Sequence, residues 1–195
     1  LEIHEGLSAY TRGALKESLC HIVGVQFRNC ATVGGSIFGR YGFSDVLTMF
    51  LALDSYVELY HAGRVPMFQF VNMPKDRDVL VNIIVKKTPL SCVYLSQRNT
   101  KTDFPVLTCA ASLLEGKART VIGARPGRAV ILTDENGILK DFKEMTKKQR
   151  QAAVPAFSDY AAEHVTVGGN MRGSAQYRKL LTKVLTRRAW EALGD

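Results

Sequence analysis

A glycine-rich segment between residues 28 and 45 limits the folds open to this chain more than any other stretch does. It contains four glycines, with an adjacent pair at Gly34 and Gly35, and it ends in Ser44-Asp45, a pair typical of a helix start. Two neighbouring glycines allow two backbone N–H groups to approach a ligand closely. Successive N–H groups in a turn form a concavity that suits an anion such as phosphate. The segment therefore predicts either a phosphate-binding turn or a tight packing contact.

Composition bounds the class of protein. The 195 residues are 46% hydrophobic and 23% charged, which is typical of a globular chain with one large domain or two small ones. The sequence contains no run of about 18 apolar residues, so it predicts no membrane span. The four cysteines form no CxxC pair, so the sequence predicts free thiols in a reducing cytoplasm and no metal site. The scattered histidines predict no catalytic acid or base.

The net charge of +8 gives the chain a basic surface. Such a surface is compatible with nucleic acid, anionic lipid or an acidic protein subunit. Aromatic residues are not interleaved with the basic ones, as single-strand readers require. We therefore expect no nucleic-acid partner, although a basic α+β nucleic-acid module stays open as an alternative.

Periodicity predicts an α+β fold. Helices are expected over residues 15–25 and 45–53, followed by strands over 56–60 and 79–85. The sequence Lys86-Lys87-Thr88-Pro89 marks a break between two parts. Beyond it, strands are expected near 91–95, 106–114, 119–124 and 129–132, in an antiparallel meander with a turn at Glu115-Gly116-Lys117.

Two helical regions are expected to cover one face of this second sheet. The first runs from about Asp141 to Glu163 and is interrupted or restarted at Pro155. The second starts at a Ser174 cap. Its apolar stripe is expected to contain Tyr177, Leu180, Leu181, Val184 and Leu185.

The order of these motifs resembles the flavin-binding subunit of the molybdenum hydroxylases, the family of xanthine dehydrogenase and of the carbon monoxide dehydrogenase flavoprotein. The resemblance covers nearly the whole chain. It is carried by RNCATVGGSIF, SDVLTMFLALDSYVELY, TKTDFPVLTCAASLL and NMRGSAQYRKLLTKVLTRRAWEAL. It implies that residues 1–86 are the latter part of a two-part FAD-binding domain and that 87–195 are a carboxy-terminal α+β domain. The family's first phosphate-binding loop is then expected before Leu1.

The resemblance also implies a set of cofactor-binding residues. Asp45 aligns with a carboxylate that accepts hydrogen bonds from cofactor hydroxyls, and Leu80 aligns with a strand position whose backbone contacts the cofactor. The loop positions and the two apolar residues after them are Thr32, Val33, Gly34, Gly35, Ser36, Ile37 and Phe38. Ser36 stands where the family usually has asparagine. Leu95 stands where xanthine dehydrogenases often carry a lysine, for which Arg98 and Lys101 are candidate substitutes.

The implied function is electron relay by an FAD-dependent oxidoreductase subunit. A molybdenum cofactor on a large partner and iron–sulfur clusters on a small partner would supply the electrons, and NAD is a candidate acceptor. The alternative from another class is a scaffold subunit that keeps the fold without FAD.

Overall fold

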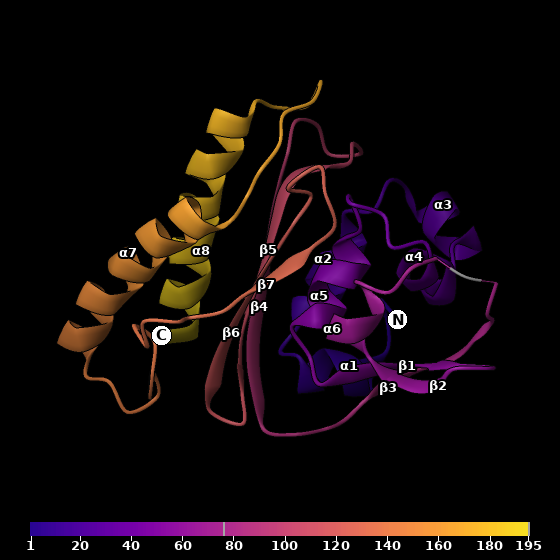
Figure 1. The fold of residues 1–195 in the computed structure, drawn as a ribbon, viewed down its shortest axis with the longest axis horizontal. Coiled ribbons are helices and arrows are strands. Elements are labelled where there is room, and N and C mark those ends of the chain that lie inside the picture. The colour runs from indigo at the N-terminus through magenta and orange to yellow at the C-terminus, as the bar shows by residue number, and fades with distance from the viewer. Residues whose placement is uncertain (76, 195) are drawn as a thin grey trace.

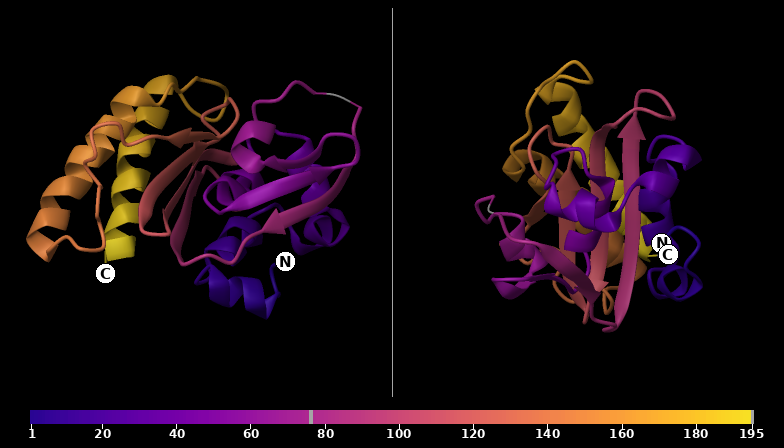
Figure 2. Two further views of the ribbon diagram at one scale, coloured as in Figure 1. Left: turned by 60° about the horizontal axis from the view of Figure 1, so that its bottom comes forward. Right: turned by 90° about the vertical axis from the view of Figure 1, so that its right-hand side faces the viewer.

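Three layers make up the protein, seen here in a computed structural model that describes residues 1–75 and 77–194 (Figure 1). A four-stranded antiparallel sheet stands in the middle, with two long helices on one face. Short N-terminal helices and a second, three-stranded sheet lie on the other side (Figure 2). This arrangement confirms the α+β class and adds helices to both faces of the central sheet.

The central sheet is the predicted meander, with the strand order β4-β5-β6-β7. Its strands are β4 (Leu90–Arg98), β5 (Pro105–Leu114), β6 (Lys117–Gly123) and β7 (Val130–Leu132). Glu115 and Gly116 connect β5 to β6 with φ angles of 51° and 80°. Positive φ at both residues is the signature of a type I′ turn, which fits the right-handed twist of a hairpin.

The first long helix is continuous, contrary to the expectation from sequence. Helix α7 (Lys147–His164) passes through Pro155 and starts only after Thr146, whose side chain forms a capping box with Gln149. Proline removes one helical hydrogen bond, but buried Val154 and Phe157 pack on either side of it and hold the helix together. Packing therefore outweighs the local cost, and residues 141–146 lie outside the helix.

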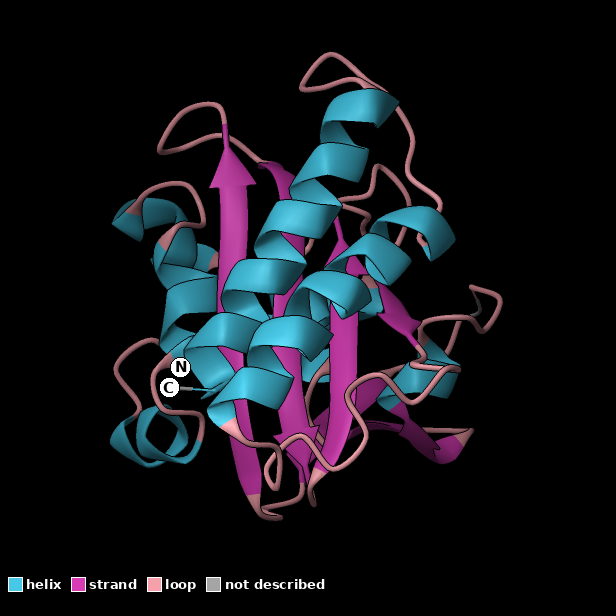
Figure 3. Ribbon diagram, turned by 90° about the vertical axis from the view of Figure 1, so that its left-hand side faces the viewer, coloured by secondary structure: helices cyan, strands magenta, loops and turns pink. Residues whose placement is uncertain are grey.

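Helix α8 (Ala175–Gly194) lies beside α7 on the same face of the sheet (Figure 3). The Ser174 cap is confirmed, since its hydroxyl accepts from the Tyr177 amide at 3.1 Å. The predicted apolar stripe is partly wrong, because Leu180 is 57% exposed and Tyr177 lies at the surface. The buried stripe is rotated toward the sheet and includes Trp190, whose ring nitrogen donates to Thr120.

The N-terminal part contains short elements. Its helices are α1 (Glu5–Tyr10), α2 (Ala14–Cys20), α3 (Val25–Cys30), α4 (Val33–Phe38), α5 (Asp45–Leu51) and α6 (Met67–Phe70). Its strands are β1 (Ser55–Leu59), β2 (Gly63–Pro66) and β3 (Leu80–Val85), in the order β2-β1-β3. The helix expected to reach residue 25 ends at Cys20, because Val23 adopts a φ of 44° and the chain restarts as α3. The burial expected for the second helix is confirmed, since all of α5 is buried.

The two parts share a core. Residues 86–89 link the two sheets, at the position where the sequence predicts a boundary. One hydrophobic cluster nevertheless joins α2 and α5 to Cys92, Tyr94 and Ala110 of the central sheet. A second cluster lies between that sheet and α7 and α8. Across residues 1–75 and 77–194, none of the helices has both the length and the apolar character needed to cross a bilayer.

Candidate functional site

The adjacent glycines lie in the first turn of helix α4, and not in an extended turn as expected. The Thr32 side chain caps this helix by accepting from the Gly35 amide at 3.0 Å. A Cβ atom at Gly35 would approach the Thr32 hydroxyl to 3.0 Å, so glycine permits the cap. The amides of Val33 and Gly34 come too early in the helix to bond within it. They are the two donors that α4 offers to an anion.

Gly42 lies in a tight packing contact, which is the other structure that the glycine segment predicts. A Cβ atom there would collide with the backbone carbonyl of Pro126. The Gly42 carbonyl in turn accepts from the Ala124 amide at 2.9 Å, next to the end of β6. One glycine of the segment thus fastens it to the central sheet, while the pair at 34–35 shapes a helix start.

A cavity of about 420 Å³ opens beside the α4 helix start. Residues of the α2–α4 region form one wall, the start of α5 forms the floor, and the end of β4 with the following loop forms the other wall. The lining residues are Ile22, Val23, Phe27, Ala31, Thr32, Gly35, Ser36, Tyr41, Phe43, Ser44, Asp45, Val46, Arg98, Asp103 and Phe104.

The structure brings four of the nine sequence-predicted binding residues to this cavity. They are Thr32, Gly35, Ser36 and Asp45. The other five do not line it.

Ile37 has no exposed surface and belongs to the core, as Phe38 does in packing at 6.2 Å against Phe70. Gly34 faces Leu80, since a Cβ atom would lie 3.8 Å from the Leu80 side chain. Leu80 and Val33 also pack against the core. Any cofactor contact by these five residues stays a prediction.

Asp45 is the centre of a buried polar cluster. Its Oδ1 atom accepts from the Tyr94 hydroxyl at 2.5 Å and forms an ion pair with the Arg98 guanidinium. Only 5% of the Asp45 side chain and 8% of the Arg98 side chain are exposed. Burial raises the pKa of Asp45, and the charge and hydrogen bond of Arg98 oppose that rise. Burial, followed by the nearby Asp45 charge, raises the pKa of Tyr94.

Arg98 has further binding capacity. Its Nη1 atom donates to the Asp103 carbonyl at 2.7 Å, but its buried Nε atom finds no hydrogen-bond partner among the residues that the structure describes. Burial of a guanidinium N–H donor without a hydrogen-bond partner costs free energy. The cavity wall therefore holds a fixed positive charge.

Leu95, which aligns with a lysine of the xanthine dehydrogenases, does not line the cavity. It packs on the opposite face of β4, against the cluster beneath α7 and α8. The cation of this cavity is Arg98, whereas Lys101 is absent from the residues that line it.

Aromatic rings form the cavity rim. Tyr41 stacks on Phe43 with centroids 5.3 Å apart, and Phe43 meets Phe104 at 4.2 Å. These three rings are 51%, 40% and 40% exposed. Arg172 lies over Phe104 and pairs with Asp103 at 2.9 Å, which lowers the pKa of that carboxyl. The rim thus presents flat apolar surface to whatever enters the cavity.

Sequence reasoning missed most of this second wall. Asp103 and Phe104 line the cavity and Tyr94 bonds to Asp45, and only tertiary placement brings these three residues to this site. The period-two alternation along β4 was the available signal, because it places Tyr94 on the face opposite Leu95.

Similarity to known proteins agrees with this geometry. Residues 2–88 match the family described as the FAD binding domain in molybdopterin dehydrogenase. The uncharacterized protein YgfM of Escherichia coli K12 is 25% identical over 173 residues, which are 88% of this chain and 62% of that protein. The chain thus spans less than two thirds of the curated relatives it matches.

Two solved structures share the fold across nearly the whole chain. Carbon monoxide dehydrogenase from Hydrogenophaga pseudoflava, in a form lacking the Mo-pyranopterin moiety of its cofactor, matches with a TM-score of 0.80 at 22% identity. The match covers 96% of this chain and 69% of the other. Quinoline 2-oxidoreductase from Pseudomonas putida 86 matches with a TM-score of 0.77 at 20% identity, covering 100% and 72%. Residues 2–88 thus match the family of FAD-binding domains of molybdopterin dehydrogenases, and the chain shares its fold with these two solved structures.

Proposed function

We propose that this chain holds FAD in an oxidoreductase complex of the molybdenum hydroxylase type. The observation that carries the proposal is the cavity beside the start of α4, which combines the hydroxyl-bearing residues Thr32 and Ser36, a buried cation and an aromatic rim. A dinucleotide with a planar ring needs these features together, because its diphosphate is anionic and its ring system is flat. FAD supplies two-electron redox chemistry when bound.

The residues present fit this cofactor in their donor set. The Val33 and Gly34 amides are donors at the start of α4, next to the cavity-lining residues Thr32 and Gly35. The Ser36 hydroxyl donates to the Thr32 carbonyl at 3.2 Å and could still accept a hydrogen bond from the ribityl chain. Tyr41, Phe43 and Phe104 offer apolar faces. The buried Nε atom of Arg98, which meets no partner among the described residues, places positive charge where a reduced flavin would carry negative charge.

Asp45 differs from its expected role in one respect. Its Oδ1 atom already accepts from Tyr94 and Arg98, so it holds Arg98 in place at the cavity wall. We propose that Asp45 acts mainly as a positioning residue, with any contact to cofactor hydroxyls left to its second oxygen.

The partners of the complex are part of the proposal. Electrons would come from a large molybdenum-cofactor subunit through a small iron–sulfur subunit, and NAD is the proposed acceptor. The basic surface suits docking to acidic subunits, as the net charge of +8 favours.

A titration of FAD into the purified chain, followed by flavin fluorescence, tests the proposal. Phe43→Ala should weaken binding by about 1–3 kcal/mol, roughly 5- to 150-fold, through lost stacking. Phe68→Ala is the matched control, because Phe68 is 49% exposed but lies on α6, away from the cavity. Equal affinity of the two variants would contradict the binding of FAD at this cavity. No FAD binding by the chain and by its reconstituted complex would favour the scaffold alternative.

A further inference from the structure

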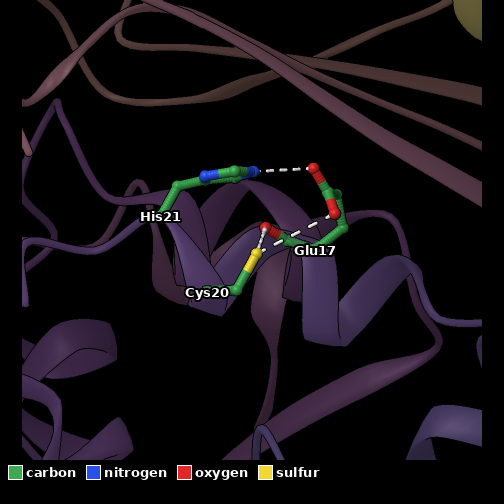
Figure 4. A group of neighbouring side chains, drawn as sticks. All are labelled: Glu17, Cys20 and His21. Atoms are coloured by element: carbon green, nitrogen blue, oxygen red, sulfur yellow. Dashed lines mark hydrogen bonds and ion pairs between the residues drawn. The ribbon is translucent and has the colours of Figure 1, made fainter. Parts of the chain in front are cut away.

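Helix α2 ends in three side chains whose ligand atoms converge. Glu17, Cys20 and His21 lie three and four positions apart, so that helical geometry places them on one face. Figure 4 shows the Glu17 carboxylate facing both the His21 imidazole and the Cys20 thiol, with a dashed line to each. We propose that Glu17, Cys20 and His21 form a binding site for a divalent transition metal of the zinc class.

The distances suit a metal after small side-chain rotations. The Glu17 Oε1 and His21 Nε2 atoms are 2.8 Å apart, and the Cys20 Sγ atom is 3.8 Å from Glu17 Oε2. One atom from each residue lies within 4.8 Å of the other two. Tetrahedral zinc with ordinary bond lengths separates its ligands by roughly 3.3–3.6 Å. The observed separations bracket that range, and the exposed Glu17 side chain can rotate at little cost between the half-buried Cys20 and His21.

The chemistry of the donor set selects the metal. One thiolate, one imidazole and one carboxylate suit borderline-soft ions such as Zn²⁺ or Co²⁺ and disfavour Mg²⁺ and Ca²⁺, which prefer oxygen. Three protein ligands leave a fourth position for water. The His21–Glu17 ion pair alone is 38% and 53% exposed, so by itself it contributes little to stability.

The local charge also favours a cation. Glu17 and Glu2 both raise the pKa of the Cys20 thiol, after the larger effect of burial, and Arg28 opposes them. Arg28 is itself paired with Glu2 at 2.9 Å. A zinc-class ion binds the thiolate form of cysteine, so binding of M²⁺ to a Cys20 thiol releases that proton to solvent. His21 immediately precedes Ile22 and Val23 of the cavity wall, so a bound metal would hold that wall.

The sequence carries only a weak signal for this site. A search for clustered cysteines passes over a Glu-x-x-Cys-His pattern, which contains only one cysteine. The proposal is independent of FAD, because none of the three ligands lines the cavity.

Cobalt titration of the full chain, kept reduced with a phosphine, tests the proposal. We expect one Co²⁺ per chain, a near-ultraviolet thiolate-to-cobalt charge-transfer band, and loss of the band when Zn²⁺ displaces Co²⁺. Cys20→Ser should remove the band, and Glu17→Gln and His21→Gln should each weaken binding at least about tenfold. Calorimetry of Zn²⁺ binding in buffers of different ionisation enthalpy should report one proton released.

The matched controls are Cys30→Ser and His61→Gln, which alter an exposed cysteine and an exposed histidine elsewhere. Both should bind cobalt as the parent chain does. Absence of the charge-transfer band in the parent chain, its survival in Cys20→Ser or its loss in Cys30→Ser would each overturn the proposal. Far-ultraviolet circular dichroism of every variant establishes that α2 is intact.

Discussion

Replacing Asp45 by alanine removes the shared acceptor of a buried cluster. The Tyr94 hydroxyl donates to Asp45 Oδ1 at 2.5 Å, and the Arg98 guanidinium pairs with the same atom. After the substitution, Arg98 keeps only its bond to the Asp103 carbonyl and stays 8% exposed. A buried charge without its counter-ion is among the most costly single defects in a folded protein.

The expected cost of Asp45→Ala is about 3–5 kcal/mol, the range for removing one partner of a buried ion pair. Asp45→Asn should cost less, below about 2 kcal/mol, because the amide oxygen can still accept from both donors. Asp159→Ala is the control for an exposed pair. Asp159 and Lys183 are 53% and 45% exposed, so their loss should cost about 0–1 kcal/mol.

Urea unfolding followed by tryptophan fluorescence measures all three variants. The chain has a single tryptophan, Trp190, which is fully buried between α8 and the central sheet and reports loss of that packing. The free energy of unfolding follows from the midpoint and the slope. If Asp45→Ala cost no more than Asp159→Ala, the cluster would not be held together as described. If Asp45→Asn were as costly as Asp45→Ala, the charge would matter more than the acceptor.

The pH dependence has a defined sign. Burial raises the pKa of Asp45 above its ordinary value of 3.8, so the folded chain keeps this proton at pH values where the unfolded chain has lost it. The unfolded state then binds fewer protons, and the contribution of Asp45 to the free energy of unfolding falls as pH rises through that window. Wild type relative to Asp45→Asn should therefore be more stable below pH 3.8 than at neutral pH.

Three further outcomes are expected. Gly35→Val should abolish FAD retention while the circular dichroism spectrum stays unchanged. Normal flavin content in this variant would contradict the binding of FAD beside the start of α4. Trp190→Phe should cost about 1–3 kcal/mol in urea unfolding followed by far-ultraviolet circular dichroism, because the Thr120 hydroxyl loses a donor at 2.9 Å; an unchanged midpoint would count against that bond. Cys109 should react far more slowly with a disulfide reagent than exposed Cys30, because burial raises its pKa to about 12; equal rates would refute this.

The regular strands and the hairpin were predictable because their signals are local. Alternating and branched residues define β3 to β7, and the residues Glu115 and Gly116 fix the register of β5 against β6. The short helices α3, α4 and α6 were missed because four to six residues carry no visible period. Such helices are stabilised by packing more than by propensity.

The candidate site was predictable on one wall only. The glycine segment and the helix start at Ser44-Asp45 locate this wall and the floor of the cavity from sequence, although the helix α4 itself was not predicted. The opposite wall depends on β4 reaching Arg98 with a register irregularity between Gln97 and Arg98, which no local pattern specifies. The aromatic rim needs residues 41–43 and Phe104 together, and these come from loops more than 60 positions apart.

The contacts between the two parts of the chain limit how it can fold. Asp45 comes from the part before the link at 86–89, whereas Tyr94 and Arg98 come from the part after it. The buried helix α5 would expose part of its apolar surface if the central sheet were absent, since the cluster that covers it includes Cys92, Tyr94 and Ala110. A boundary near residue 86 therefore separates two sheets but not two independent folding units. The cavity forms only where both parts are folded together, so binding of a cofactor there would stabilise the contact between them.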